Sequence, residues 1–448
     1  MTDKDIQKIA EAVVDLIIKN GTCVTHEKTF KADIAVKKGK IVQVGDVEKF
    51  KAKQIINAKG MHILPGAFDS QCHFREPGGE HKEDLKSGSM AAVAGGITSI
   101  FDMPNNKPSI TTEKLFKKKL ARAKNRMFCE HAFYMGAERD NIAEIKKVEK
   151  LDGCCGIKIF VGSSTGNLLV SDFSDVGNII KKTRKRVSLH SEEENLLNAR
   201  KKYIKANDVK SHIIWRNPAT ALTSTKKLVA IANKLKKKIH ILHITTKEEV
   251  DLLAKNKKYV SFEITPQHVS FYAPDCYDKL GTYAQMNPPI RSIAHYKKLR
   301  SALKNSIVDV IGSDHAPHSK KEKNQNYPDS PSGMPGVQTL LPVLLDLAAQ
   351  KLISLNQVVK MTSHNVVNIF NIKDKGKLNK GYDADFSIVN LDKQHKITNA
   401  QILSKCKWTP YHGITLQGKV IGTIIRGEKV YWNNKIIGKA KGQPIKFN

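Results

Sequence analysis

Short apolar, β-branched runs alternate with helical patterns along most of the chain. Amphipathic stretches such as EDLKSGSMAAVA and TSTKKLVAIANKLKKK lie between these runs, with the spacing of surface helices. Strands that alternate with helices pair in parallel, and eight such units within about 250 residues predict an α/β fold, a (β/α)8 TIM-like barrel. The eight runs cover residues 64–74, 95–104, 128–136, 156–162, 186–193, 238–246, 259–268 and 308–318.

The two ends of the chain share a pattern that differs from the alternating strands and helices between them. Residues 13–60 consist of short strand-like runs with turns, and the segments GKLNKGYDADFSIVNL and GKVIGTIIRGEKVYWNN near the other end look alike. We therefore expect a small β-sandwich domain built from both termini. Its parts would be residues 1–62 and 376–448, with the barrel formed by residues 63–375.

Nearly every run of the predicted barrel begins with apolar residues and ends with polar ones. The carboxyl ends of barrel strands meet on one face, so side chains far apart in sequence would gather there. One or two such histidines would be ordinary structural residues, but the same placement in strand after strand predicts a functional site. The residues are Gln71, His73, Arg75, Asn105, Lys158, His190, His243, His268, Asp314 and His318.

Imidazole and carboxylate side chains in this set indicate a metal site. His190 and His243 end consecutive predicted strands, and Asp314 ends the last one; such groups are suitable ligands for zinc or a similar divalent ion. Lys158 ends a buried-looking strand, where a free ammonium is costly. It is either carboxylated to a carbamate that bridges two cations, or an ion-paired or snorkelling lysine, and composition alone favours the second reading.

Composition narrows the class of protein. The 448 residues are 40% hydrophobic, which excludes an intrinsically disordered chain. Seven scattered cysteines fit a reducing cytoplasm. The N-terminal stretch has acidic residues ahead of a short, interrupted apolar run, unlike a signal peptide, and no run approaches the about 20 apolar residues of a membrane span. We expect a cytoplasmic protein that does not contact a membrane.

The charge balance is strongly basic. Lysine and arginine outnumber aspartate and glutamate by 75 to 43, a formal net charge of +32. The lysines form short runs with acids between them, without a basic arm or an aromatic-rich basic stripe, so we expect a solvated surface and no nucleic-acid partner. Such a surface favours the arrival of a small anionic substrate.

The motifs closely resemble those of dihydroorotases in the amidohydrolase superfamily. Residues 69–78 match D-x-H-x-H-x-R-E-P-G except at one position, and residues 103–105 match M-P-N. The resemblance covers essentially the whole chain. The segments GIKIF, LHSEEE, LHITT, NPPIR, GSDHAPH and PSGMPGVQTLLP follow in the family's order and spacing.

The resemblance implies a binuclear zinc centre and a site for an anionic ring. Asp314 would also be the catalytic proton shuttle, and Asn287 and the backbone of residues 333–336 would touch the ring. Arg75, Asn105 and His318 would hold the substrate carboxylate. The implied metal ligands are His73, Lys158 as its N6-carboxylated form, His190, His243 and Asp314.

The implied activity is that of a zinc-dependent cyclic amide hydrolase. The resemblance implies reversible cyclisation of N-carbamoyl-L-aspartate to dihydroorotate in pyrimidine biosynthesis, by a metal-bound hydroxide with Asp314 as proton shuttle. One position departs from the family, because Gln71 stands where the first histidine is usual. An amide oxygen is a weaker zinc ligand than imidazole, so Gln71 either holds one ion loosely or does not ligate, leaving one or two ions per subunit.

Two other readings remain open. Another cyclic amidohydrolase, acting on allantoin or a hydantoin, would share Lys158 and the histidines but would not need Arg75, Asn105 and His318. A non-catalytic partner of aspartate transcarbamoylase would not need the complete set of site residues. The superfamily makes a homodimer the expected assembly, and association with aspartate transcarbamoylase is a further expectation.

Overall fold

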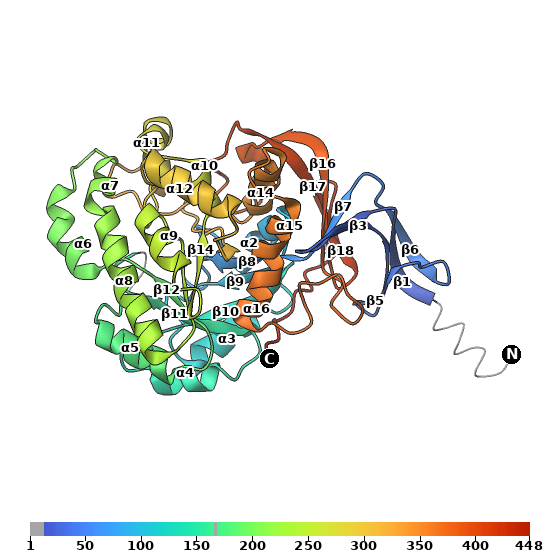
Figure 1. The fold of residues 1–448 in the computed structure, drawn as a ribbon, viewed down its shortest axis with the longest axis horizontal. Helices are drawn as coiled ribbons and strands as arrows, with labels where there is room; N and C mark the ends of the chain where they lie inside the picture. Colours follow the sequence, from blue (N-terminus) through green and yellow to red (C-terminus); the bar gives the residue numbers. More distant parts are fainter. Residues whose placement is uncertain (1–12, 165–167) are drawn as a thin grey trace.

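A computed structural model describes residues 13–164 and 168–448 of the chain. The stretch that we expect not to be a signal peptide begins outside the described residues. Figure 1 shows a helix-covered barrel on one side of the molecule and a β domain on the other, with the described N-terminal strands in the β domain. Among the described residues, no helix is both long and apolar enough to cross a membrane.

The barrel consists of eight parallel strands in sequence order. Hydrogen bonds just beyond the strands close it, because the His73 amide donates to the His315 carbonyl at 2.8 Å. β9, β10 and β11 are buried at every position, as expected for parallel strands covered on both faces. The strands are β8 Ala67–Cys72, β9 Ile97–Asp102, β10 Glu130–Gly136, β11 Cys154–Phe160, β12 Val187–His190, β13 Ile239–Ile241, β14 Val260–Ile264 and β15 Val310–Ile311.

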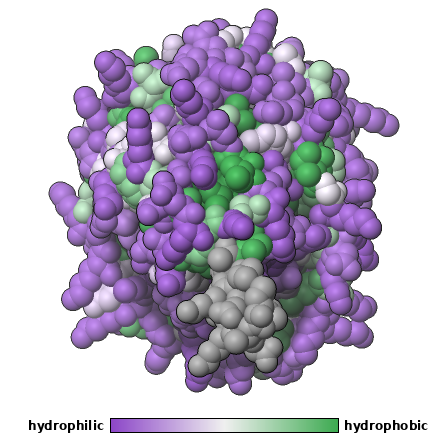
Figure 2. Space-filling view, turned by 90° about the vertical axis from the view of Figure 1, so that its right-hand side faces the viewer, coloured by the Kyte–Doolittle hydropathy of each residue, from purple (hydrophilic) through white to green (hydrophobic). Residues whose placement is uncertain are grey.

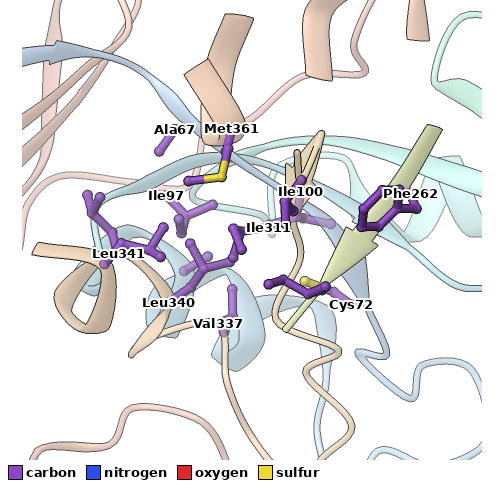
Figure 3. Close-up of a cluster of buried hydrophobic side chains, with 14 of the residues drawn as sticks. Ala67, Cys72, Ile97, Ile100, Phe262, Ile311, Val337, Leu340, Leu341 and Met361 are labelled. Atoms are coloured by element: carbon purple, nitrogen blue, oxygen red, sulfur yellow. The ribbon is translucent and has the colours of Figure 1, made fainter. Parts of the chain in front are cut away.

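Helices surround the strands and bury the largest hydrophobic cluster. Figure 3 shows Ile97 and Ile100 of β9 packed near Leu340 and Leu341 of α14. N-cap side chains fix the start of many of these helices. For example, Asp84 caps α2 by accepting a hydrogen bond from the Ser87 amide at 2.7 Å. The helices are α2 Leu85–Ala94, α3 Glu113–Ala123, α4 Ile142–Val148, α5 Phe173–Lys182, α6 Glu194–Arg200, α7 Ser211–Trp215, α8 Pro218–Leu235, α9 Lys247–Ala254, α10 Pro266–Ser270, α11 Asp275–Leu280, α12 Ile293–Lys304, α13 Lys320–Lys323, α14 Leu340–Ala349, α15 Leu355–Val359 and α16 Asn365–Phe370.

The β domain joins strands from both ends of the chain, so the predicted fold class is confirmed. β7 pairs with β16 and β2, which links N-terminal and C-terminal strands in one seven-stranded sheet, and a four-stranded sheet of order β5-β4-β1-β6 packs on it through a second apolar cluster. The strands are β1 Val13–Lys19, β2 Thr22–Val24, β3 Thr29–Lys31, β4 Asp33–Lys37, β5 Lys40–Gly45, β6 Lys51–Asn57, β7 His62–Pro65, β16 Phe386–Lys396, β17 Thr415–Ile425, β18 Glu428–Trp432 and β19 Lys435–Ile436.

The chain returns to the barrel after the β domain. The Ile445 amide donates to the His131 carbonyl, and the Gly153 amide donates to the Ile445 carbonyl, both at 2.9 Å. Ile445 is fully buried in an apolar cluster with Phe101 and Phe370. Residues 443–447 therefore cover the end of the barrel where β10 and β11 begin.

The surface of the β domain is mostly hydrophilic. Figure 2 shows the face of the molecule that lies on the right-hand side of Figure 1, and hydrophilic side chains cover most of it. Ile55 of β6 is the most exposed large hydrophobic side chain of the described residues, at 58%. Scattered exposures of this kind are ordinary for a soluble surface.

Candidate metal and substrate site

The structure brings the predicted site residues together at the carboxyl ends of the barrel strands. All of them except His268 and His318 line one cavity, and His318 contacts Arg75 through its Nε2, 3.3 Å from Arg75 Nη2. The accessible volume is about 20 Å³, room for about one water molecule. The cavity is lined by Gln71, His73, Arg75, Asn105, Lys158, Phe160, Ser164, His190, His243, Asn287, Asp314, Ala316, Ser332 and Gly333.

The strands themselves end earlier than the apolar runs indicated. β13 ends at Ile241 and β15 at Ile311, so His243 and Asp314 lie in the segments that follow these strands. His268 is not at the cavity, contrary to the strand-end pattern. It lies in α10, where its ring nitrogens contact the Thr265 hydroxyl and the Pro288 carbonyl. Both nitrogens therefore have partners within the protein, as in a structural histidine.

Three cavity residues have a left-handed backbone. The φ angles are +58° at Arg75, +39° at His243 and +45° at Asp314. This region is costly for residues with a branched or long side chain and tends to persist at functional sites, where it directs a side chain that a regular strand would direct elsewhere. The strain at three separate strand ends is independent support for a functional cavity.

His190 and His243 present ring nitrogens to each other. His190 Nδ1 lies 3.1 Å from His243 Nε2, while His190 Nε2 lies 2.9 Å from Glu192 Oε2. Glu192 also pairs with the buried Arg216, and its pKa is held at about 2. A carboxylate on one ring nitrogen fixes the tautomer and leaves the lone pair of the other nitrogen facing the cavity, as in metal-binding histidines.

A second pair of ligand atoms meets on the opposite side of the cavity. His73 Nδ1 lies 2.7 Å from Asn105 Oδ1, and donation there leaves the Nε2 lone pair facing Asp314 Oδ1 at 3.2 Å. Burial lowers the pKa of His73, which favours the neutral ring. Gln71 Nε2 donates to the same Asp314 oxygen at 3.0 Å, while Gln71 Oε1 is buried without a hydrogen-bond partner.

Lys158 of β11 is neither snorkelling nor ion-paired. Its side chain is 1% exposed, and no carboxylate within the described part of the chain lies within 4.0 Å of its ammonium. Burial lowers the pKa of Lys158 to about 7, with Asp314 and Glu263 opposing that effect. The structural alternative left open by composition therefore does not account for this lysine.

The donor set fits a divalent cation. Among residues 13–164 and 168–448, no three His, Cys, Asp or Glu side chains lie close enough to hold an ion by themselves. However, each pair brings together two atoms that can both present lone pairs, 3.1 and 3.2 Å apart, and a proton or a cation between them stabilises that arrangement. His243 Nδ1 and Gln71 Oε1 are also buried without partners. Lys158 lines the same cavity, and together these residues fit a metal centre.

Arg75 forms an uncompensated cationic site at the rim of the cavity. Its Nε donates to the Pro317 carbonyl at 3.1 Å, and its Nη2 lies 3.3 Å from His318 Nε2. Arg75 is 7% exposed, and no carboxylate oxygen of the described residues lies within 4.0 Å of the guanidinium. Burial lowers its pKa to about 10. A buried guanidinium without a carboxylate is suited to an anion that enters from outside.

Asn287 lines the cavity, and a hydrogen bond with His212 holds its side chain in place. His212 Nε2 lies 3.0 Å from Asn287 Oδ1 and 3.1 Å from the Met286 carbonyl. Gly333, on the other side of the cavity, has a φ of +144°, and a side chain there would lie 2.4 Å from the Ala316 carbonyl oxygen. The predicted ring contacts therefore lie on two loops that the structure places over the strand ends.

Sequence reasoning gave no role to the buried groups that support the cavity. Glu192 orients His190, and Asp102 accepts from the Phe74 amide while pairing with the fully buried Lys119 at 2.6 Å. The SEEE run after His190 and the charge at the end of β9 were the available signals. Neither could be distinguished from surface charge before the fold was known.

Two larger hollows contain none of the predicted site residues. One of about 400 Å³ lies where β12 begins, and another of about 1010 Å³ lies between the barrel and the β domain near Arg426. The small cavity holds convergent lone pairs, an unpaired guanidinium and strained backbone. Its chemistry identifies it as the candidate site although its volume is smaller.

Known proteins with similar sequences are cyclic amidohydrolases. The chain is 34% identical over 428 residues to a dihydroorotase of Pyrococcus abyssi, covering 95% of this chain and 97% of that protein. It is 32% identical over 441 residues to a dihydroorotase of Methanosphaera stadtmanae, covering 97% and 96%. It is also 32% identical over 444 residues to an allantoinase of Desulfitobacterium hafniense, covering 96% and 98%.

Solved structures show the same architecture. The chain matches the L-hydantoinase of Arthrobacter aurescens with a TM-score of 0.92 and 25% identity, covering 96% of this chain and 99% of that one. The family model described as the amidohydrolase family matches residues 62–430. With this match, the barrel and the strand-end site, the chain belongs to the amidohydrolase family.

Proposed function

We propose that this protein is a dihydroorotase, which interconverts N-carbamoyl-L-aspartate and dihydroorotate. The observation that carries the proposal is Arg75, a buried guanidinium at the cavity without a carboxylate partner among the described residues. Dihydroorotate carries a ring carboxylate that a bidentate guanidinium can bind. Allantoin and hydantoin rings are neutral and leave such a cation uncompensated.

Metal ions would be held by the two pairs of converging atoms and by Lys158 as its carbamate. The free amine of Lys158 adds to carbon dioxide and loses a proton, so that an anion replaces a buried cation. His190 and His243 would bind on one side, and His73 and Asp314 on the other. When bound, one or two zinc ions would lower the pKa of water to about 7 and polarise the ring carbonyl.

The protein's own residues then handle the proton and the substrate. In hydrolysis the water oxygen bonds to the ring carbonyl carbon, the ring C–N bond breaks, and the nitrogen gains a proton. Asp314 accepts the proton from the attacking water and delivers it to the leaving nitrogen. Its carboxylate is held by Gln71 and His73, while Arg75 and Asn105 fix the substrate carboxylate.

Ring opening by the purified zinc-loaded protein tests the proposal. We expect turnover of dihydroorotate, detected by loss of its ultraviolet absorbance, and at least about 100-fold lower kcat/KM for allantoin and hydantoin because these lack the carboxylate. Lys158→Ala should reduce kcat by about 10³-fold or more and lower the zinc content. Preferential turnover of a neutral ring, or undiminished activity of the Lys158→Ala variant, would contradict the assignment.

The same assay decides between the other candidate roles. The similarity to an allantoinase favours a neutral-ring substrate as the second candidate. A non-catalytic partner of aspartate transcarbamoylase would be folded yet inactive on all three substrates. The retained converging ligand atoms support an active enzyme over that role.

Location and assembly remain proposals. All seven cysteines are free and buried, which supports a reducing compartment such as the cytoplasm. We keep the homodimer and an association with aspartate transcarbamoylase as predictions, which light scattering of the protein alone and with the transcarbamoylase would test.

A further inference from the structure

Lys82 lies behind the candidate carboxylate site, in the segment between β8 and α2. Its Nζ lies 3.0 Å from His318 Nδ1 and 2.8 Å from Glu322 Oε1, and its side chain is 20% exposed. On the other side of the imidazole, His318 Nε2 lies 3.0 Å from the Ser332 carbonyl. Lys82 therefore contacts a residue of the site without lining the cavity itself.

The position of Lys82 is fixed from the N-terminus of α13. Ser319 and Glu322 form a capping box, in which the Ser319 amide and hydroxyl donate to Glu322 Oε2 at 2.9 and 2.7 Å. This leaves Glu322 Oε1 directed at the Lys82 ammonium. A capped helix terminus thus anchors the lysine that contacts His318.

The two contacts of His318 determine its tautomer. Burial, together with the cations Arg75, Lys82 and Lys323, lowers the pKa of His318 well below its usual value, so the ring is neutral. An ammonium only donates and a carbonyl only accepts. Lys82 therefore requires a lone pair on Nδ1, and the Ser332 carbonyl requires a proton on Nε2.

This tautomer places two donors side by side at the cavity rim. The protonated Nε2 of His318 lies 3.3 Å from Arg75 Nη2, and two N–H groups cannot bond to each other. An anion there would accept from the guanidinium and share the Nε2 proton of His318 with the Ser332 carbonyl, which resolves the conflict. The carboxylate of the proposed substrate is such an anion.

We propose that Lys82 is a positioning residue that holds His318 as the Nε2–H tautomer, so that His318 and Arg75 together bind the substrate carboxylate. The inference rests on the proposed function for the identity of the anion. The tautomer itself follows from the contacts of His318 alone. Lys82 thus acts through His318 and contributes to selectivity for an acidic ring.

Substitution of Lys82 with two readouts tests this inference. In the zinc-loaded enzyme, Lys82→Met should raise KM for dihydroorotate by about 10-fold or more, the cost of a charge-assisted hydrogen bond, while kcat changes by less than about 3-fold. Lys82→Arg keeps a cationic donor and should recover most of the loss. ¹⁵N NMR of histidine-labelled protein should show an unprotonated Nδ1 and a protonated Nε2 for His318, with a higher His318 pKa in Lys82→Met.

A neighbouring lysine provides the matched control. Lys405 pairs with Asp84 at 2.5 Å and donates to the Glu80 carbonyl, so it braces the same segment without contacting His318. Lys405→Met should leave both KM and the His318 tautomer unchanged. If Lys405→Met reproduces the KM increase, Lys82 acts only through general bracing and the inference is wrong.

The outcomes separate this inference from the proposed function. An unchanged KM in Lys82→Met, or an Nδ1-protonated His318 in the unsubstituted protein, would overturn the positioning role. Failure of the unsubstituted enzyme to open dihydroorotate would instead overturn the proposed function. In that case the NMR tautomer and its response to Lys82→Met still decide whether Lys82 positions His318.

Discussion

Gln71 is the site residue whose chemistry differs most from the pattern of the related motif. Its amide nitrogen donates to Asp314 while its oxygen is buried without a partner. The side chain therefore orients the carboxylate and can offer only a neutral oxygen to an ion. Imidazole binds zinc more strongly than an amide does. The residue at this position is thus expected to set how firmly an ion beside His73 and Asp314 is held.

Replacing Gln71 by histidine should strengthen metal binding. We expect Gln71→His to retain up to about one additional zinc equivalent per subunit after dialysis against a weak chelator, because it adds an imidazole ligand. Mass spectrometry of the metal content measures this directly. Gln350→His, on the surface at the end of α14, is the control and should retain no extra zinc. Equal zinc retention by the Gln71→His and unsubstituted proteins would show that position 71 does not ligate.

At the scale of the element, the C-terminal segment closes the end of the barrel opposite the site. Residues 443–447 pair with the start of β10 and the turn before β11 and bury Ile445 against Phe101 and Phe370. Apolar residues far apart in sequence thus form one cluster beneath the strands. The segment stabilises the strands whose other ends carry the site.

Truncating Ile445 should therefore destabilise the protein. Ile445→Ala is expected to lower the free energy of unfolding by about 2–5 kcal/mol through lost burial and the cavity left behind. Ile437→Ala, at a position 37% exposed, should change it by less than about 0.5 kcal/mol. Urea unfolding followed by circular dichroism measures both. Equal stabilities of the two variants would mean that the segment does not support the barrel.

At the scale of the whole molecule, a buried ion cluster joins the barrel to the β domain. Lys375 is 5% exposed and pairs with Asp385 at 2.7 Å, Asp383 at 2.8 Å and Glu130 of β10 at 3.5 Å. Burial raises the pKa of Asp383, but Lys375 and Lys40 outweigh burial and hold it below the usual 3.8. In Glu130, burial prevails over Lys375 and raises the pKa.

Removing Lys375 should weaken the molecule in a pH-dependent way. Lys375→Met leaves the buried Asp385 without its cation, while Asp383 keeps Lys40 and Glu130 keeps Arg426. It should lower the free energy of unfolding by about 3–5 kcal/mol at neutral pH. Burial already raises the pKa of Glu130 to about 6 against the effect of Lys375, so without the lysine this pKa rises further and stability is lost as pH rises from the unfolded-state pKa through the folded one. The deficit should therefore be larger at about pH 7.5 than at about pH 5.

A surface lysine provides the comparison for Lys375. Lys279→Met removes an exposed pair with Asp275 and should cost less than about 1 kcal/mol. Urea unfolding of both variants at the two pH values measures the effect. A Lys375→Met deficit that is independent of pH would mean that the carboxylates of the cluster do not depend on this lysine.

The sequence by itself determined the order of strands and helices and most of the polar residues that gather at the cavity. The hydrophobic period of each element and its degree of burial can be read along the chain. A parallel strand covered on both faces is apolar along its length, and polar residues follow directly after it. The barrel, the two-ended β domain and the strand-end residues at the cavity follow from that local pattern, whereas Asn287 and Gly333 were implied only by the resemblance to a known family. His268 shows the limit of this pattern, because Thr265 caps a short helix directly after β14 and His268 lies within that helix.

Only the tertiary structure decided which distant side chains contact one another. The pairing of His190 with His243, the buried guanidinium of Arg75 without a carboxylate and the contact of Lys82 with His318 depend on which side chains meet across the fold. Residues 82 and 318 are brought together only when the barrel closes. Electrostatic interactions act through space and burial changes their strength, so the roles of charged residues were fixed by folding and not by sequence neighbours.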